Sequence, residues 1–333
     1  MTAHGTPDDL AVGWLLDAGG PAVRLRTLRD VLGKAPAASS DDVLADDLVT
    51  GLLAGQEHDG GFGVHPYRKW SGGFWRLVSL ADLGVPGDDP RVRALVAHVL
   101  TWLTGPTRRT RDRMVAGLTR HCASQDGLGL SAVCRLGHAG DPHAEQLARW
   151  LVQWQWPDGG WNCDVRASGR RSSMHETHGP IDGLVAFADA TGATWARESA
   201  DAAVELLLDH RVLEAVRPAA AGEVLHRSML QLRYPAYWHY GLLRALIVLA
   251  RAGAVGDPRT DDARDRLYAR RASDGRWPSD GAWWRHPGAR GSNVEVVDWG
   301  RGHDNAMLTL HALLVRRAAG DLDLSLRGAT ARS

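Results

Sequence analysis

The sequence has few cysteines and no long apolar run, and each scarcity excludes a class of protein. Three cysteines occur in 333 residues, namely Cys122, Cys134 and Cys163, and none belongs to a Cys-x-x-Cys pair. They cannot form a closed disulfide framework, which favours a reduced, cytoplasmic setting. No uncharged apolar run approaches the roughly 18–20 residues of a membrane span, and the N-terminus lacks the pattern of a secretory signal. We therefore expect a soluble protein without a transmembrane segment.

An excess of charge of either sign is also absent. The chain has 39 basic and 39 acidic residues, and its formal net charge is zero. Only Lys34 and Lys69 of the basic residues are lysines. Proteins that bind nucleic acids carry a basic excess as their electrostatic footprint, so we expect no nucleic-acid partner.

Tryptophan is the residue that the sequence has in excess. There are 14 Trp against 5 Tyr and 3 Phe. Disordered chains are poor in aromatic residues, and a chain of this length can bury a large core. The composition therefore predicts a folded, globular protein.

Six segments of the chain end in an apolar helical run that is closed by a glycine. Glycine just past the end of a helix is the usual left-handed cap. After three of the caps, Gly-Asp-Pro or a close variant predicts the start of a new helix. The separations between successive caps are 51, 53, 55, 61 and 67 residues by subtraction. The six capping glycines are Gly33, Gly84, Gly137, Gly192, Gly253 and Gly320.

Each repeat therefore predicts two helices. The first is amphipathic, as in residues 144–153, and the second is apolar nearly all round, as in residues 242–250. The second pattern is typical of a helix that is buried on both sides. No alternating strand pattern persists anywhere. Six such hairpins make either an open solenoid or a closed ring, and the periodicity alone does not choose between them.

The turns between the helices carry a second repeat. It reads Gln-x-x-Asp-Gly-Gly-Phe/Trp at residues 56–62 and 155–161, and a degenerate copy occupies residues 272–277. In these turns the chain resembles the terpenoid cyclase and protein prenyltransferase superfamily, whose members carry such QW motifs. The resemblance implies an all-α fold, an α/α toroid of about six helical hairpins whose inner and outer helix rings surround an apolar pocket. The similarity extends from about residue 21 to residue 320, and we expect a single domain over residues 1–333 with residues 321–333 as a flexible tail.

The chain departs from both well-known branches of that superfamily. Class II cyclases such as squalene–hopene cyclase begin their chemistry with a DxDD acid, which this sequence lacks. Protein prenyltransferases bind zinc with an Asp-x-Cys pair and a distant His, whereas here Cys163 and Asp164 are adjacent. In size the chain is similar to the single toroids of small bacterial squalene-cyclase-like or prenyltransferase-like proteins.

Three hypotheses for the function follow from this resemblance. The first is a terpenoid-cyclase-like enzyme, an isomerase that encloses an apolar, isoprenoid-like substrate and cyclises or rearranges it by acid- or metal-assisted chemistry. The second is a zinc-dependent, prenyltransferase-like transferase or cyclase. The third is a non-catalytic toroid that binds a ligand or docks a partner. Each is compatible with a monomer or a homodimer.

Candidate site residues lie where the predicted inner helices open. In a toroid these openings crowd one rim of the pocket, and four of the five openings contain histidine, which carries protons and binds metals. His175 and His178 stand three residues apart, so they share a helix face and, with His303, can form a zinc site. Histidines that cap helices are the alternative, and no other cofactor is expected. The predicted catalytic residues are Asp304, His303, His175, Glu176 and His239.

Asp304 is the candidate general acid. It lies between His303 and an apolar helix, where loss of water contact raises the pKa of a carboxyl group. The alternative is that Asp304 caps the helix over residues 305–319, and Glu176 carries the same ambiguity. Cys163 is a candidate ligand or nucleophile, or else a small buried residue.

The tryptophans divide into two groups. Trp156, Trp161 and Trp277 belong to the turn motifs and are expected to be structural. Others fall near the helix openings, where they line the pocket and stabilise a substrate cation, or else pack in the core. The predicted substrate-binding residues are Trp70, Trp75, Trp238, Tyr240, Trp299, His121 and Cys122.

Overall fold

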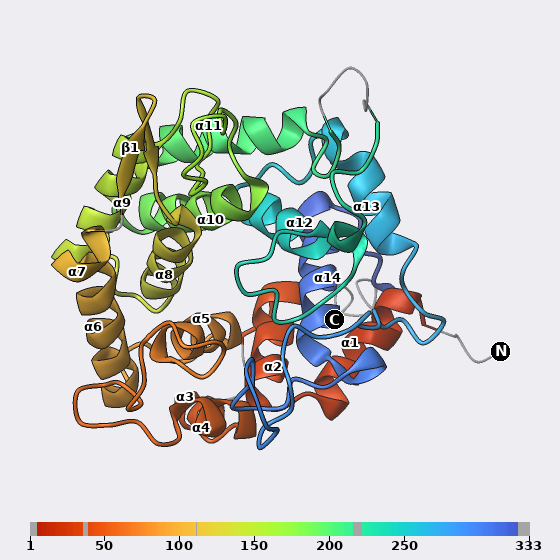
Figure 1. Cartoon of the computed structure of the whole chain (residues 1–333). Helices are drawn as coiled ribbons and strands as arrows, with labels where there is room; N and C mark the ends of the chain where they lie inside the picture. The colour runs from red at the N-terminus through yellow and green to blue at the C-terminus, as the bar shows by residue number, and fades with distance from the viewer. Residues whose placement is uncertain (1–4, 36–38, 111, 216–221, 326–333) are drawn as a thin grey trace.

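The computed structural model describes residues 5–35, 39–110, 112–215 and 222–325, and this part of the chain is mostly helical. The inner helices lie around the middle of the molecule (Figure 1). They alternate along the chain with outer helices, as the repeat predicts. The six inner helices are α2 (Pro21–Arg26), which continues into the π-helical turn η1 (Thr27–Val31), α5 (Gly73–Leu83), α8 (Ala123–Arg135), α10 (Met174–Thr191), α12 (Leu242–Arg251) and α14 (Ala306–Ala319).

Each inner helix contacts the next one in this series. The contacts run from α2 to α5, α8, α10, α12 and α14, and α14 contacts α2 and η1 in turn. The outer helices lie against them and bury only a stripe of residues each. These outer helices are α1 (Pro7–Ala18), α3 (Ser40–Leu44) with α4 (Asp47–Leu53), α6 (Pro90–Thr104), α9 (Pro142–Trp154), α11 (Thr194–Asp209), and η4 (Pro258–Thr260) with α13 (Asp261–Tyr268).

The predicted helix ends are confirmed. All six capping glycines have positive φ angles, between 65° at Gly33 and 84° at Gly137. The carboxylates of Asp89, Asp141 and Asp257 each accept a hydrogen bond from a backbone N–H in the first turn that follows, with proline at the first helical position. These local signals therefore delimit the elements correctly.

In two copies of the turn motif, the last tryptophan is buried and makes the same kind of hydrogen bond. Trp161 is buried, and its indole N–H donates to the carbonyl of Leu151 at 2.9 Å. Trp277 is also buried and donates to the carbonyl of Leu267 at 2.8 Å. Each indole therefore ties its turn to the outer helix that precedes it. In the motif at residues 155–161, the side-chain amide of Gln155 also donates to the carbonyl of Ser199 in the following outer helix α11 at 2.8 Å.

Helices α8 and α10 make the closest helix contact near the site. A Cβ atom on Gly127 would lie 2.1 Å from the backbone nitrogen of Pro180, and one on Gly183 would lie 2.4 Å from the carbonyl oxygen of Gly127. Real side chains cannot occupy such positions, so glycine is required for this backbone-to-backbone approach. The approach brings the first turns of the two helices together.

One insertion was not predicted from the sequence. Between α6 and α8 the chain forms α7 (Pro106–Arg109) and a two-stranded antiparallel hairpin of β1 (Arg113–Val115) and β2 (Leu118–Arg120). Each strand has only three residues, too few for an alternating pattern to be recognised. The short 3₁₀ turns η3 (Arg227–Leu230) and η5 (Gly302–Asp304) complete the elements.

The sequence predicts that the chain has no transmembrane helix and that its last residues form a flexible tail. Within the described ranges no helix combines the length and the apolar character needed to cross a bilayer. Of the segment 321–333 that we expected to be a flexible tail, residues 326–333 lie outside the described residues. Before them, Leu322 is buried, and Asp321 accepts a hydrogen bond from the hydroxyl of Tyr268 at 2.7 Å.

Candidate functional site

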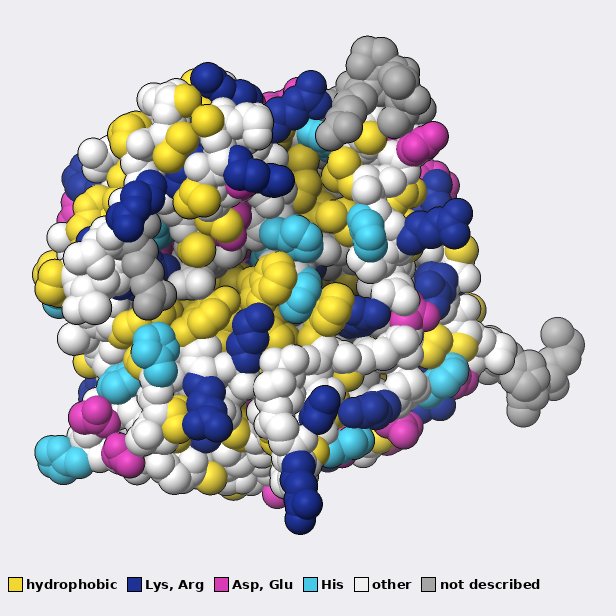
Figure 2. All heavy atoms as spheres, in the orientation of Figure 1, with side chains coloured by type: hydrophobic (Ala, Val, Ile, Leu, Met, Phe, Trp, Pro, Cys, Tyr) yellow, Lys and Arg dark blue, Asp and Glu magenta, His cyan; other side chains and the backbone are white. Residues whose placement is uncertain are grey.

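A cavity of about 460 Å³ lies between α6, α7, the β1–β2 hairpin and the start of α8. The loops at residues 62–72 and 155–173 complete its wall. Figure 2 shows that hydrophobic side chains and histidines gather around the middle of this face of the molecule. The cavity combines aromatic, cationic, polar and thiol side chains: His65, Tyr67 and Trp102; Arg108, Arg120 and His121; Asp112 and Gln125; Cys122 and Cys163.

The aromatic wall consists of His65, Tyr67 and Trp102. The ring of Trp102 on α6 stacks on Tyr67 with 6.0 Å between centroids and meets the edge of His65 at 5.7 Å. Behind them, Tyr67 contacts Trp75 at 5.0 Å, and Trp75 is fully buried. The wall is thus held by packing on the inner helix α5, and the guanidinium of Arg108 lies over the Trp102 ring at 5.3 Å.

His121 closes the base of the hairpin. Its Nδ1 atom lies 2.5 Å from Asp112, which precedes β1, and its Nε2 atom lies 2.8 Å from the buried Asp126 of α8. Although burial lowers the pKa of His121, the charges and hydrogen bonds of Asp126 and Asp112 raise it to about 9. The imidazole is therefore protonated at neutral pH, and both of its nitrogens donate hydrogen bonds.

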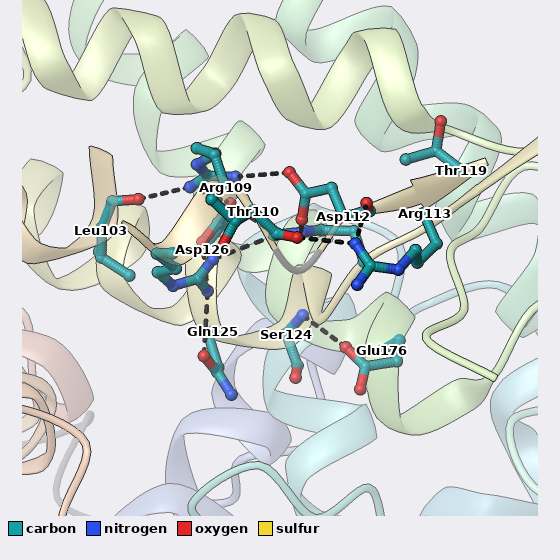
Figure 3. Close-up of polar contacts among 12 residues, drawn as sticks. Leu103, Arg109, Thr110, Asp112, Arg113, Thr119, Ser124, Gln125, Asp126 and Glu176 are labelled. Atoms are coloured by element: carbon teal, nitrogen blue, oxygen red, sulfur yellow. Dashed lines mark hydrogen bonds and ion pairs between the residues drawn. The ribbon is translucent and has the colours of Figure 1, made fainter. Parts of the chain in front are cut away.

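Two arginines form ion pairs with the carboxylates that contact His121. Arg109 lies 3.1 Å from Asp126 and 3.7 Å from Asp112, and Figure 3 shows it between these two carboxylates. Arg108 lies 2.7 Å from Asp126 and donates to Gln125 at 3.0 Å. Although burial opposes ionisation of Asp126, the charges of Arg108 and His121 hold its pKa well below the usual value. These ion pairs connect α7 to α8 and to Asp112, which precedes the hairpin.

Arg120 differs from the other cations of the cavity because no carboxylate of the described residues forms an ion pair with it. Its side chain is buried at 2% exposure and lies over the ring of Trp156 at 4.4 Å. One terminal nitrogen, Nη2, donates to the carbonyl of Gly169 at 2.7 Å. Nε and Nη1 are buried and find no partner in the ranges that the structure describes. Burial of a guanidinium with unpaired N–H donors destabilises the folded protein unless an anion binds to it.

Two thiols and a carboxylate gather at the inner side of the cavity. Cys122 caps α8, Cys163 follows the turn at residues 155–161, and Glu176 lies in the first turn of α10. One donor atom from each lies within 4.8 Å of the other two. Glu176 is buried, and its Oε2 atom accepts a hydrogen bond from the backbone N–H of Ser124 at 2.9 Å, as Figure 3 shows.

The two thiols have different acidities. A hydrogen bond from Cys163 lowers the pKa of Cys122, whereas the same hydrogen bond and burial raise the pKa of Cys163 far above its usual value. In the pair, Cys122 is therefore the more acidic thiol and Cys163 is the hydrogen-bond donor. A thiolate is the nucleophilic and metal-binding form of cysteine.

No family model and no curated protein matches this chain. Its structure is similar to a protein from Actinoplanes, with 16% identity, coverage of 93% of this chain and 88% of that chain, and a TM-score of 0.41. It is also similar to type II terpene cyclase MstE from Scytonema. A variant of that enzyme in complex with geranylgeranyl dihydroxybenzoate is 13% identical over 85% of this chain and 98% of its own, with a TM-score of 0.30.

The three histidines predicted to bind zinc are not brought together. Tyr240 donates its backbone N–H to Nδ1 of His175 at 2.9 Å. His178 is fully buried, with Nε2 against the carbonyl of Trp238 at 3.1 Å and Nδ1 accepting from Arg244 at 3.3 Å. His303 is exposed and lies beside Asp274. Burial lowers the pKa of His178 to about 3, so it is neutral and both its nitrogens are already engaged.

Asp304, the predicted general acid, lies outside the cavity. Its side chain is 85% exposed, and its nearest cation is Arg276 at 4.0 Å. The burial on which we based the choice of Asp304 is therefore absent. It does not cap α14 either, because Asn305 takes that position and accepts a hydrogen bond from Leu308. Asp304 and Trp299 line a separate hollow of about 630 Å³ beside α1 and α4.

Most of the predicted aromatic residues pack against other side chains and do not line the cavity beside the hairpin. Trp70 is buried and stacks on Tyr237 at 3.6 Å. His239 lies between Trp238 at 3.9 Å and Trp283 at 3.8 Å, and burial lowers the pKa of His239 to about 4. Tyr240 is buried and donates its hydroxyl to the carbonyl of Val212 at 2.6 Å.

Among the candidate residues from the sequence, the structure brings four to this cavity or against it: His121, Cys122, Cys163 and Glu176. Sequence reasoning missed Arg120, Asp112 and Asp126. The signal for Asp126 was available, because a carboxylate in the first turn of a helix that is otherwise apolar needs a buried cation. The signal for Arg120 was not, since it depends on the unpredicted hairpin.

Proposed function

We propose that this chain is a terpenoid-cyclase-like enzyme with an α/α-toroid architecture, which encloses an isoprenoid-like substrate in the cavity beside the β1–β2 hairpin. The substrate carries an anionic group as well as an apolar part. The enzyme cyclises or rearranges it by acid- or metal-assisted chemistry. The contacts of each inner helix with the next, and of α14 with α2, support the toroid.

The observation that carries the proposal is the state of Arg120. Its guanidinium is almost completely buried, borders the cavity and has two nitrogens without a partner among the described residues. Phosphate, diphosphate and carboxylate groups match the planar donor array of a guanidinium. An anion in the cavity would satisfy these donors and offset the desolvation of the charge.

The aromatic wall of the cavity suits the apolar part of such a substrate. The rings of His65, Tyr67 and Trp102 can bind hydrocarbon by area burial and stabilise a developing cation. The volume of about 460 Å³ is in the range of small-molecule sites. A compact isoprenoid with a charged head group therefore fits both halves of the lining.

Within this proposal, Glu176 and Cys122 are the groups placed to move a proton. Glu176 is buried beside the cavity and is held by the N–H of Ser124. Cys122 lines the cavity, and its pKa is lowered by the hydrogen bond from Cys163. Asp304 is exposed and takes no part in the proposed chemistry.

A zinc-dependent transferase or cyclase is the second candidate, because two thiols and a carboxylate lie within 4.8 Å of one another. A toroid that binds a ligand without converting it is distinguished from both enzymes by turnover alone. All three share the cavity, so ligand binding is the first property to measure.

Calorimetric titration with a matched set of ligands tests the proposal. Farnesyl and geranylgeranyl diphosphate carry both parts of the expected ligand, whereas farnesol and inorganic diphosphate each carry one. We expect the prenyl diphosphates to bind most tightly, and Arg120→Met to weaken them about 10- to 100-fold, the range of a charge-assisted hydrogen bond, with farnesol unaffected. Conversion of a bound ligand is then followed by chromatography.

Arg149→Met is the matched control. Arg149 also stacks on a tryptophan, Trp195, at 4.7 Å, but it lies on the exposed side of α9. Its variant should bind every ligand as the wild type does. The proposal fails if no member of the panel binds, or if Arg120→Met and Arg149→Met bind the diphosphates equally well.

A further inference from the structure

The cluster of Cys122, Cys163 and Glu176 has the composition of a metal site. It offers two sulfur atoms and one carboxylate oxygen, all within 4.8 Å of one another. Around a tetrahedral zinc ion with ordinary bond lengths, such donors lie about 3.6–3.8 Å apart. Contraction of about 1 Å at most is needed to reach that geometry, and side-chain rotation of two cysteines supplies it.

Three separate parts of the fold hold the donors in place. Cys122 and Glu176 come from the first turns of α8 and α10, whose backbones meet at Gly127 and Gly183. The loop that carries Cys163 is tied to the segment before α8, because the N–H of His121 donates to the carbonyl of Asn162 at 3.3 Å. The donors are therefore preorganised on a rigid frame, as a metal site requires.

The chemistry of the donors selects the metal. Thiolates prefer zinc and other soft or borderline ions, whereas magnesium and calcium prefer oxygen ligands only. Cysteine binds zinc as the thiolate, so metal binding at this cluster releases the protons of the cysteine thiols to solvent.

Among the described residues the cluster has no fourth ligand, and this leaves a coordination position that faces the cavity. His121 is the nearest histidine in sequence, but Asp112 and Asp126 engage both of its nitrogens. Both cysteines line the cavity. Three protein ligands with one open position are typical of catalytic zinc sites, whereas structural sites are closed by four.

We propose that Cys122, Cys163 and Glu176 bind one zinc ion, whose open position faces the cavity beside the hairpin. This donor set differs from the Asp-x-Cys pair that the prenyltransferase resemblance would supply and from the three histidines that the sequence suggested. As zinc ligands, Cys122 and Glu176 serve the metal-assisted form of the proposed function and not its acid-assisted form. Binding of zinc itself does not depend on the nature of the substrate, so it can be tested separately.

Metal binding can be measured on the full chain without any substrate. The protein is purified with a reductant, stripped with a chelator, shown by thiol titration to have three free thiols, and titrated with Zn²⁺ in competition with a chromogenic chelator. We expect one zinc per chain. Titration with Co²⁺ should give a sulfur-to-metal charge-transfer band, because two of the ligands are thiolates.

Variants locate the site. Cys163→Ser and Glu176→Gln should each lower the zinc affinity by more than 100-fold, beyond the roughly 10- to 100-fold effect of changes outside the ligand shell. Cys134→Ser is the control, since Cys134 is a buried cysteine on α8 outside the cluster. Helical circular dichroism confirms that each variant is folded. Serine and glutamine preserve the shape of the side chains they replace.

The proposal is overturned if the fully reduced wild type binds no stoichiometric zinc. It is equally overturned if bound Co²⁺ lacks the charge-transfer band, or if the variants of Cys163 and Glu176 bind zinc as tightly as Cys134→Ser does. Failure of the isoprenoid panel leaves these measurements unaffected, so the two proposals are tested independently.

Discussion

The backbone of Gly275 touches the carbonyl oxygen of Pro7 so closely that a Cβ atom on Gly275 would lie 2.3 Å from it. Gly275 belongs to the turn after α13, and Pro7 begins α1, so the contact joins the end of the repeat series to its beginning. The two other turn motifs dock on the next outer helix in the same way. Gly60 approaches Ala94 of α6, and Gly159 approaches Ala202 of α11.

Replacing this glycine should loosen the junction between the first and last repeats. We expect Gly275→Ala to reduce the free energy of unfolding by about 2–4 kcal/mol, since it combines overpacking with a left-handed backbone angle. Gly253→Ala is the matched control: its φ is also positive, at 77°, but a Cβ there meets nothing within 4 Å. Its loss should be about 1–2 kcal/mol. Equal losses in urea unfolding would show that the Pro7 contact is unimportant.

The indole of Trp161 should be needed for the stability of its turn. Trp161→Phe removes the donor to the buried carbonyl of Leu151 and leaves that acceptor unpaired. We expect a loss of about 2–4 kcal/mol, from the unpaired acceptor and the lost volume together. Trp195→Phe, in a half-buried position on α11, should cost about 1 kcal/mol or less. A similar loss for both variants in denaturant unfolding would contradict the assigned role of the motif.

The local features of this fold could be predicted from the sequence, and the relations across it could not. Glycine caps and Asp-Pro helix starts act within a few residues, and each was found where the sequence placed it. Which helix openings share a cavity depends instead on their positions around the series of inner helices. Cys122 and Glu176 meet because α8 and α10 are in direct contact. His303 opens a helix two positions further along the series and lies exposed.

The aromatic residues illustrate the same limit. The sequence placed Trp70 and Trp238 near helix openings, which is correct, but it could not tell a lining residue from a packed one. Stacking of Trp70 on Tyr237 depends on a loop from the far end of the chain. The hairpin that carries Arg120 left no periodic signal, because its strands have three residues each.

The charge of His121 should make stability depend on pH above neutrality. Its pKa is raised from 6.5 to about 9 in the folded chain, chiefly by Asp126 and Asp112 against the effect of burial. The stabilisation is therefore complete below pH 6.5 and is lost as the pH rises through 9. The shift corresponds to roughly 3 kcal/mol.

We expect the free energy of unfolding of the wild type to fall between pH 6.5 and 9 relative to that of His121→Gln. The difference between the two proteins, measured by urea unfolding across this range, isolates the contribution of the imidazole. His143→Gln serves as the control, because His143 is half exposed and pairs with Asp141 at the surface. A constant difference between wild type and His121→Gln across the range would mean that His121 is not charged in the folded chain.

Separate substitution of the two candidate acids, Glu176 and Asp304, distinguishes the cavity beside the hairpin from the site that the sequence suggested. Glu176→Gln keeps an oxygen that accepts the hydrogen bond from the N–H of Ser124, so the start of α10 should remain folded. It removes the charge and the titratable proton, and we expect turnover of an accepted substrate to fall about 10²- to 10⁴-fold, the usual contribution of general acid–base catalysis. Asp304→Asn changes a side chain that is 85% exposed and should leave turnover within a factor of two. Single-turnover rates of the three proteins decide the matter: an unchanged rate for Glu176→Gln, or a large loss for Asp304→Asn, would move the chemistry away from the cavity beside the hairpin.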